Sequence, residues 1–205
     1  MTRPLSIAIV GAGMGGLAAA AALRRVDIDV TVYEQATQFA RIGAGIQIGC
    51  NAMKVLRGLG LEARLRGQSF YPRSWNNRDW RTGEVKFDMI FGESAEQKFG
   101  APYLLAHRGD LHAALASAVP DEHIKLGHKL VGLDGTGDGV RLTFANGVVT
   151  TADAVVGVRL LDGRRVEDID TASLDELGDG GDGVGVVGVV VRGGGIVLRV
   201  GWSVF

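Results

Sequence analysis

The sequence predicts an α/β fold whose parallel sheet begins with a strand, a helix and a second strand. Three observations support this. Ser6–Val10 is a short apolar run typical of a buried strand. A glycine-rich turn, Gly11–Gly16, separates it from the alanine-rich stretch Leu17–Arg25, whose composition favours a helix. Asp29–Tyr33 alternates as the next strand, and two strands joined through a helix run parallel.

The middle of the chain predicts further helices and a small antiparallel sheet. One helix is expected over Asn51–Leu59, with Asn51 as its N-cap, and another over Asp110–Val119, which carries apolar residues along one face. Between them, Arg73–Asn76 and Val85–Met89 are short extended pieces that suggest two antiparallel strands.

The stretch before residue 157 predicts a second antiparallel sheet and a return to the parallel one. Three segments alternate like strands, and Asn146-Gly147 between the last two is a strong hairpin signal: Lys129–Asp134, Val140–Phe144 and Val148–Thr151. Ala154–Val156 then reads as a buried strand that rejoins the parallel sheet.

Composition excludes several classes of protein. The 205 residues are 46% hydrophobic and 22% charged, as in an ordinary globular protein. A net charge of −1 gives no electrostatic reason to expect nucleic acid or an anionic membrane as a partner. Cys50 is the single cysteine, so no internal disulfide or multi-cysteine metal site can form, and a cytoplasmic location is expected. The four histidines lack ligand spacing, so no metal is expected.

The uncharged stretch Leu5–Leu23 has a second interpretation, because it follows Arg3 and superficially resembles a signal peptide or a membrane span. Four glycines inside the stretch argue against a membrane helix. The position of Glu34 at the end of the next apolar run favours a binding motif instead.

That motif is Gly11-Ala12-Gly13-Met14-Gly15-Gly16, which matches the dinucleotide-binding pattern G-x-G-x-x-G. Gly11 allows a tight turn out of the strand, Gly13 lets the backbone approach a pyrophosphate, and Gly16 allows close packing of helix against strand. The pyrophosphate would lie at the helix N-terminus, where free N–H groups and the helix dipole favour negative charge.

Glu34 lies 18 residues beyond Gly16, near the spacing of a carboxylate that binds ribose hydroxyls. A carboxylate there would repel a 2′-phosphate, so the bound dinucleotide is expected to be FAD or NAD rather than NADP. The alternative is a glycine-rich turn with a surface glutamate, and the motif alone does not separate FAD from NAD.

Two further segments bear on that choice. The run from Arg41 to Gly49 is rich in glycine, which allows a backbone to pass close to a flat ligand. Arg108 stands within His107–Leu115, just before a predicted helix. Together with Gly11, Glu34 and the strand that follows Ala152-Asp153, these segments resemble the FAD-dependent aromatic hydroxylases, the class of p-hydroxybenzoate hydroxylase. Within the class, the chain is most similar to the salicylate hydroxylase and 6-hydroxynicotinate 3-monooxygenase branch, from about Leu5 to Gly157.

The resemblance implies a Rossmann-like FAD-binding fold and a reaction in which NAD(P)H and O₂ hydroxylate a small aromatic or pyridine carboxylate or phenol. It leaves the catalytic base and the oligomeric state open. The residues expected to bind the cofactor are Gly11, Gly13, Met14, Gly15, Gly16, Glu34, Arg41, Gly45 and Arg108.

For several of these residues a structural role competes with the functional one. Arg41 and Arg108 are expected to contact the phosphate and ribityl region, and the alternative for each is a surface salt bridge. Gln47 is either a hydrogen-bonding partner of the substrate or structural. His107 and His112 are expected to be cap or surface residues. A group of four aromatic residues is expected to pack within the small sheet rather than line a pocket: Trp75, Trp80, Phe87 and Phe91.

The expected organisation is an FAD-binding domain over residues 1–157, with part of a substrate domain inserted at about 70–105, and a tail over 158–205. The tail is rich in Gly, Asp and Val, and we interpret it as low-complexity or out-of-frame sequence, with one strand possible at Val184–Val191. The Asp-Gly and Gly-Asp motifs that the family has beyond this point are not recognisable. The fold is therefore expected to be incomplete at the C-terminus, with weak or absent FAD binding and no hydroxylation by this chain alone.

Two other classes of function stay open on the sequence. The first is an NAD-binding dehydrogenase, or another FAD oxidoreductase with the same N-terminal unit. The second is a non-catalytic remnant that at most binds a nucleotide.

Overall fold

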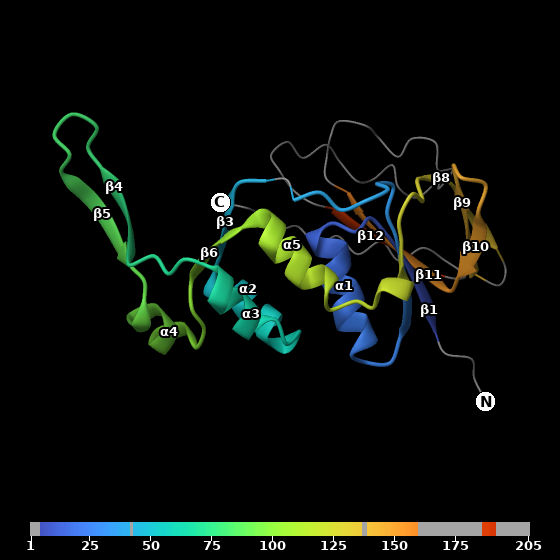
Figure 1. Ribbon diagram of the computed structural model, residues 1–205, viewed down its shortest axis with the longest axis horizontal. Coiled ribbons are helices and arrows are strands. Elements are labelled where there is room, and N and C mark those ends of the chain that lie inside the picture. The colour runs from blue at the N-terminus through green and yellow to red at the C-terminus, as the bar shows by residue number, and fades with distance from the viewer. Residues whose placement is uncertain (1–4, 42, 137–138, 160–185, 192–205) are drawn as a thin grey trace. The chain divides into compact units, whose positions relative to one another are not determined.

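The computed structural model describes residues 5–41, 43–136, 139–159 and 186–191, and the chain divides into two compact units. Unit 1 comprises Met1–Phe39 and Val119–Phe205, and unit 2 is the continuous segment Ala40–Ala118 (Figure 1). Each unit has its own sheets and helices. The α/β class predicted from the sequence is confirmed.

Unit 1 is built on a five-stranded sheet with the order β12-β11-β1-β2-β7. β1 runs parallel to β2 and β11, β2 runs parallel to β7, and β12 is antiparallel to β11. The strand–helix–strand start and the returning strand were both predicted correctly. The strands are β1 (Ser6–Val10), β2 (Asp29–Tyr33), β7 (Ile124–Lys125, after the short helix η1, Asp121–His123), β11 (Ala154–Arg159) and β12 (Val186–Val191).

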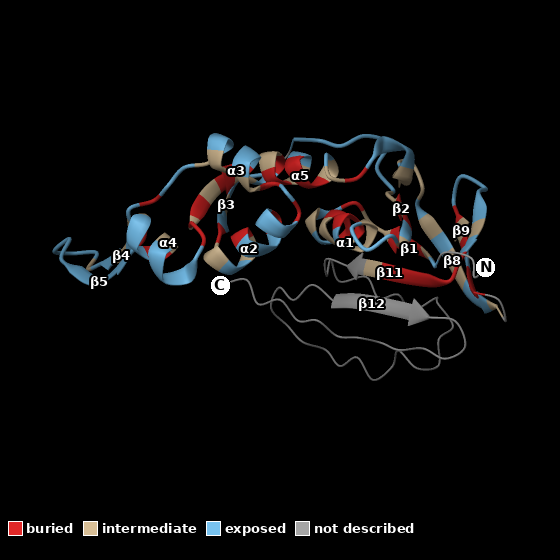
Figure 2. Ribbon diagram, turned by 90° about the horizontal axis from the view of Figure 1, so that it is seen from below, coloured by how far each residue is buried: buried red, intermediate tan, exposed pale blue. Residues whose placement is uncertain are grey.

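Helix α1 (Met14–Arg24) covers one face of this sheet. Alternate residues of β1 and β2, such as Ile9 and Val32, point to this face and are fully buried. On the helix, Leu17 and Ala20 are fully buried as well, and Figure 2 shows α1 and β1 with buried residues. The small alanine side chains let the helix axis lie close to the strands.

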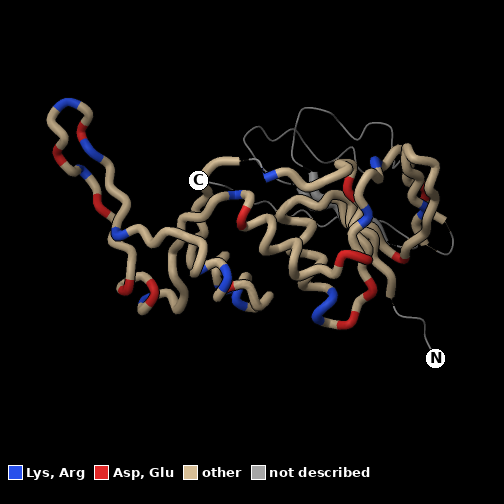
Figure 3. Tube along the Cα trace, viewed as in Figure 1, with Lys and Arg blue, Asp and Glu red and all other residues tan. Residues whose placement is uncertain are grey.

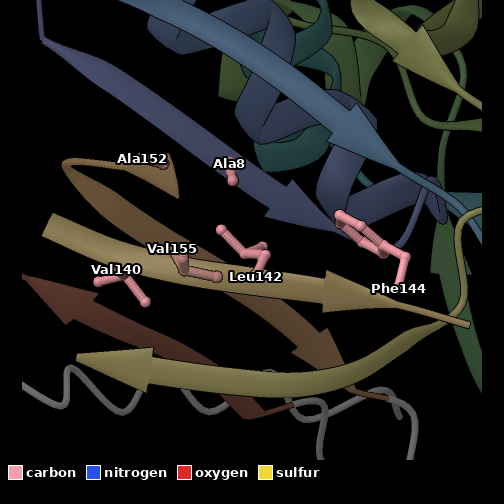
Figure 4. Packing of buried hydrophobic residues seen from close by; sticks show 6 residues of the cluster. All are labelled: Ala8, Val140, Leu142, Phe144, Ala152 and Val155. Atoms are coloured by element: carbon pink, nitrogen blue, oxygen red, sulfur yellow. The ribbon is translucent and has the colours of Figure 1, made fainter. Parts of the chain in front are cut away.

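A three-stranded antiparallel sheet packs on the opposite face: β8 (Leu130–Thr136), β9 (Gly139–Phe144) and β10 (Val149–Ala152). The two sheets share one apolar cluster (Figure 4), in which each fully buried large side chain contributes roughly 2 kcal/mol. Gly147 has a φ of 83°, as the predicted Asn-Gly hairpin turn requires. The cluster consists of Ala8, Val140, Leu142, Phe144, Ala152 and Val155.

Unit 2 contains four helices and two small antiparallel sheets in its described residues. One sheet pairs β3 with β6, and the other is the predicted hairpin of β4 and β5. The elements are β3 (Gly45–Ile48), α2 (Cys50–Gly58), α3 (Glu62–Gln68), β4 (Ser74–Arg78), β5 (Val85–Ile90), α4 (Glu93–Phe99), β6 (Leu104–His107) and α5 (Arg108–Ala116).

Two helix boundaries differ from the prediction. The N-cap of α2 is Gly49 rather than Asn51, because the backbone already enters the helix at Cys50. Helix α5 begins at Arg108, two residues before Asp110, because the His107 side chain caps it by accepting the Gly109 N–H at 3.1 Å. His107 is therefore a cap residue, as expected.

An ion-pair network joins α2, α3 and α4. The carboxylate of Glu62 accepts hydrogen bonds from Arg57 and from Arg66, and Arg66 also reaches Glu96. The pKa of Glu62 is lowered from 4.5 to about 2, first through the hydrogen bond from Arg57 and then through the one from Arg66. These contacts stabilise the ionised form of a partly buried carboxylate.

The aromatic residues of the hairpin do not pack as predicted. Trp75, Trp80 and Phe87 are 53%, 87% and 48% exposed, so the expectation of core packing is wrong for all three. Phe91, which follows β5, is buried and stacks on Tyr103, with ring centroids 4.1 Å apart. A two-stranded hairpin has too little sheet of its own to bury these rings.

The apolar N-terminal stretch forms β1 and α1. Among the helices of the described residues, none has both the length and the apolar character needed to span a bilayer.

Candidate functional site

The glycine turn between β1 and α1 depends on two glycines for its shape. Gly11 has a φ of +103°, which side-chain-bearing residues rarely adopt, and its N–H donates to the Tyr33 carbonyl at 2.8 Å. A Cβ on Gly16 would lie 2.0 Å from the Gly11 carbonyl oxygen. The start of α1 therefore lies against the backbone of the turn, as the motif predicts.

Gly13 occupies the other side of the turn and has open space beside it. It is the N-cap of α1, no side chain caps the helix, and the first turn holds no acidic residue. A Cβ built on Gly13 would meet no heavy atom within 4 Å, and the neighbouring Gly15 is exposed. Within the part of the chain that the structure describes, no side chain caps the N–H end of the helix, and such an end favours an anion.

Glu34 lies directly beside this turn. Its Oε2 accepts the Ala12 N–H at 2.8 Å, and its Oε1 accepts the Ala36 N–H at 2.9 Å. Its backbone is held by β7 and the following turn, since its N–H donates to the Lys125 carbonyl at 2.9 Å and its carbonyl accepts the His128 N–H at 2.8 Å. The glutamate is therefore part of the glycine turn and not a detached surface residue.

This arrangement suits an adenine dinucleotide. The free N–H groups and dipole of α1 favour a pyrophosphate, and the missing Cβ of Gly13 leaves room for it. Each oxygen of Glu34 has one described donor and can accept a second hydrogen bond, as from a ribose hydroxyl. The same negative charge disfavours a 2′-phosphate.

The expected site residues of unit 2 gather at the start of α5. Arg41 donates through Nε and a terminal nitrogen to the two oxygens of Asp110, both at 3.0 Å. Its side chain is 68% exposed, so this bidentate pair contributes little to stability. The salt bridge considered for Arg41 is present.

Two glycines of unit 2 make room for the arginines. Gly43 has a φ of +146°, and a Cβ there would lie 3.0 Å from the Cβ of Arg108. A Cβ on Gly109 would lie 2.7 Å from the Cγ of Arg41. Gly45 pairs with His107 between β3 and β6.

The predicted residues thus form two groups, one in each unit. Gly11, Gly13, Met14, Gly15, Gly16 and Glu34 come together in unit 1, and Arg41, Gly45 and Arg108 come together in unit 2.

The sequence did not reveal two polar contacts. Buried Asp153 accepts hydrogen bonds from the N–H and the hydroxyl of Ser6, at 2.8 and 2.9 Å, and so joins the first residue of β1 to the residue just before β11. The sequence did contain a signal for the first contact, because Asp153 is a carboxylate between two apolar runs. Tyr103 donates its hydroxyl to Gln47 at 2.5 Å. Burial, and then the nearby Cys50, raises the pKa of Tyr103, so the hydroxyl keeps its proton.

The remaining features of the described residues do not add to the site. No group of three or more His, Cys, Asp or Glu side chains in those residues could hold a metal ion. A polar hollow of about 200 Å³ in unit 1 is lined by residues such as Ser6, Asp29 and Thr150. It runs along β2 from Asp29 to Tyr33, and its lining includes no residue of the glycine turn.

Comparison with known proteins gives matches along the same segments. A family described as an NAD(P)-binding Rossmann-like domain matches residues 9–47, and one described as flavin containing amine oxidoreductase matches residues 62–157. The chain is 44% identical over 157 residues to a 6-hydroxynicotinate 3-monooxygenase of Pseudomonas fluorescens, covering 77% of this chain and 41% of that protein.

Two further relatives match the chain over a similar length. A 3-amino-4-hydroxybenzoate 2-monooxygenase of Streptomyces cremeus is 39% identical over 155 residues, covering 76% of this chain and 39% of that protein. The crystal structure of Klebsiella pneumoniae HpxO complexed with FAD and uric acid is 26% identical with a TM-score of 0.65, covering 74% of this chain and 38% of that one. The chain therefore spans about two fifths of the length of the proteins it matches.

Proposed function

The chain belongs to the FAD-dependent aromatic hydroxylase family, and on this premise we propose that its unit 1 binds the ADP half of FAD. The observation that carries the proposal is the glycine turn, in which the N–H end of α1 is open beside Gly13 and the carboxylate of Glu34 is held against the Ala12 N–H. The turn provides a helix end that binds anions and a carboxylate that accepts hydrogen bonds from sugar hydroxyls. These two features match the pyrophosphate and the ribose, which are the two polar parts of ADP.

We propose a separate task for each residue. Gly11 and Gly16 shape the turn, and Gly13 with Met14 and Gly15 gives the pyrophosphate access to the backbone N–H groups. Glu34 accepts from the adenosine ribose. When bound, FAD supplies the electron transfer from NAD(P)H and the activation of O₂ that amino-acid side chains cannot provide.

The roles of Arg41, Gly45 and Arg108 stay predictions from the resemblance. The pairing of Arg41 with Asp110 uses two N–H groups of the guanidinium, which has five, so donors for a phosphate oxygen are left. A cation at that place suits an anionic cofactor.

For the reaction, we propose hydroxylation of a small aromatic or pyridine carboxylate or phenol with NAD(P)H and O₂. The relatives named 6-hydroxynicotinate 3-monooxygenase and 3-amino-4-hydroxybenzoate 2-monooxygenase support this substrate class. The proposed organisation is an FAD-binding domain over residues 1–157 with substrate-domain residues inserted at about 70–105. We place the protein in the cytoplasm, where NAD(P)H is available.

Titration of FAD tests the proposal, with flavin fluorescence as the readout and ADP as a competitor. We expect weak binding by the chain alone, displaced by ADP. Gly13→Ala should weaken FAD and ADP at least about tenfold, because the added methyl group fills the approach to the helix N-terminus. The unliganded fold should keep its stability, since that methyl group meets no neighbouring atom.

Gly67→Ala in α3 is the matched control, because a Cβ there also has no neighbour within 4 Å. It should bind FAD like the original chain. The proposal is wrong if Gly13→Ala binds as tightly as the original chain, or if the protein binds NADH but neither FAD nor ADP.

A further inference from the structure

Asp110, at the start of α5, holds the guanidinium of Arg41 in one orientation. The Nε and Nη2 atoms of Arg41 donate to the two carboxylate oxygens of Asp110, both at 3.0 Å. Two parallel hydrogen bonds between a planar guanidinium and a planar carboxylate fix the rotation of one group relative to the other. Figure 3 shows charges of both signs at the start of α5.

The two partners are not held equally by the fold. Asp110 belongs to the first turn of α5, where the helix dipole favours a carboxylate, and its side chain is 24% exposed. Arg41 lies between β2 and β3, outside both strands. Its stem lies against Gly109, where a Cβ would be 2.7 Å from the Cγ of the arginine. The helix therefore positions the arginine, and not the reverse.

The pair leaves a second edge of the guanidinium for another ligand. Of the five N–H groups of Arg41, one on Nε and one on Nη2 are used by Asp110, so the remaining three belong to Nη1 and Nη2. One N–H from each of these two nitrogens forms a fork that fits two oxygens of a phosphate. Asp110 thus determines the direction in which Arg41 offers its remaining donors.

The carboxylate of Asp110 has two opposing effects on an anion that binds Arg41. It repels the anion, and it spares the anion the cost of ordering a long side chain. The repulsion acts across the width of the guanidinium and is screened by solvent, because the Arg41 side chain is 68% exposed. The ordering cost is not screened, so it is the larger of the two effects.

We propose that Asp110 is a positioning residue for FAD, which orders Arg41 as a donor to a phosphate of the cofactor before the cofactor binds. The proposal deepens the proposed function and rests on it, because it takes Arg41 to bind FAD. The pair itself contributes little to the stability of the fold, as is usual for an exposed ion pair.

Titration of the full chain with FAD, followed by flavin fluorescence, tests the sign of the effect. Asp110→Asn should weaken FAD binding roughly fivefold, which corresponds to the cost of ordering one arginine side chain. Arg41→Ala should weaken it at least as much. In the Arg41→Ala background, Asp110→Asn should tighten FAD binding slightly, because only the repulsion is then left to remove.

Glu93→Gln is the matched control, because it removes a carboxylate from the first turn of α4 that makes no ion pair among the described residues. It should bind FAD like the original chain. The positioning role is wrong if Asp110→Asn binds FAD as tightly as the original chain, or if it weakens binding equally with and without Arg41. In either case, weaker binding by Gly13→Ala would leave the proposed function standing. A chain that binds no FAD overturns both.

Discussion

The glycine turn of unit 1 and the start of α5 in unit 2 both use glycine where a side chain would not fit, but for opposite purposes. Beside Gly13 the space is open, and it faces the uncapped N–H end of α1. Beside Gly43 and Gly109 the space holds the side chains of Arg108 and Arg41. A glycine-rich segment can therefore admit a ligand or accommodate the chain itself, and the neighbour of the missing Cβ decides which.

The largest effect should come from the glycine with the closest neighbour. Gly16→Ala would place a methyl group 2.0 Å from the Gly11 carbonyl oxygen, which belongs to the backbone and cannot move aside. We expect a loss of about 3 kcal/mol or more in the free energy of unfolding of unit 1. Urea denaturation followed by circular dichroism measures it, with Gly13→Ala as the control. Equal free energies of unfolding for Gly16→Ala and Gly13→Ala would contradict the conclusion that only Gly16 lies against the backbone of the turn.

The two arginine-facing glycines should differ from each other. Gly43→Ala meets both a φ of +146° and the Cβ of Arg108, and we expect it to destabilise unit 2 by about 2 kcal/mol. Gly109→Ala meets the Cγ of Arg41 at 2.7 Å and the ring of His107 at 3.1 Å, and it should cost about 1 kcal/mol. Addition of Arg41→Ala should relieve the part of the second loss that comes from the closer contact, and none of the first. Denaturation of the four proteins checks this, and relief at both sites would contradict the assignment.

A smaller effect should follow from the ion pairs of α3. The pKa of Glu62 is about 2 in the folded chain against 4.5 as its ordinary value, so the carboxylate stabilises the fold fully above about pH 4.5. This contribution is lost as the pH falls through 4.5 toward 2, because the folded state then binds the proton less readily than the unfolded state. We expect about 1 kcal/mol, since the pairs are partly exposed.

Melting temperatures between pH 6 and pH 3 measure that loss. Glu62→Gln should flatten the acid dependence, whereas Glu93→Gln should not, because Glu93 makes no ion pair among the described residues. The same acid dependence in both variants would show that Glu62 is not the group responsible.

The regular elements of unit 1 were predictable because periodicity and motif agreed. β1 and β2 have the bounds expected from the alternation of apolar residues, and the helix between them follows the glycine turn. The helices α3 and α4 were not expected, since seven residues hold too few turns to show a helical period. β3 lies in a glycine-rich run that reads as a loop, and it is a strand only because β6 pairs with it.

The candidate site was predictable only as far as residue types encode it. Gly16 and Glu34 follow from the spacing of the motif. The hydrogen bond from Ala12 to Glu34 does not, because a backbone N–H is the same for every residue that has one. The exposed rings of Trp75 and Phe87 show the opposite case, in which residue type predicts burial and the surrounding hairpin supplies nothing to bury them.

The contact between Ser6 and Asp153 has a consequence for how the chain is made. It spans 147 residues, and β1 cannot gain its second parallel neighbour until the ribosome has added β11. Unit 2 is continuous and emerges whole before that moment. β1 is thus synthesised first but gains its second parallel neighbour late. During elongation, its apolar residues lack one of the two strands that later cover the edges of β1.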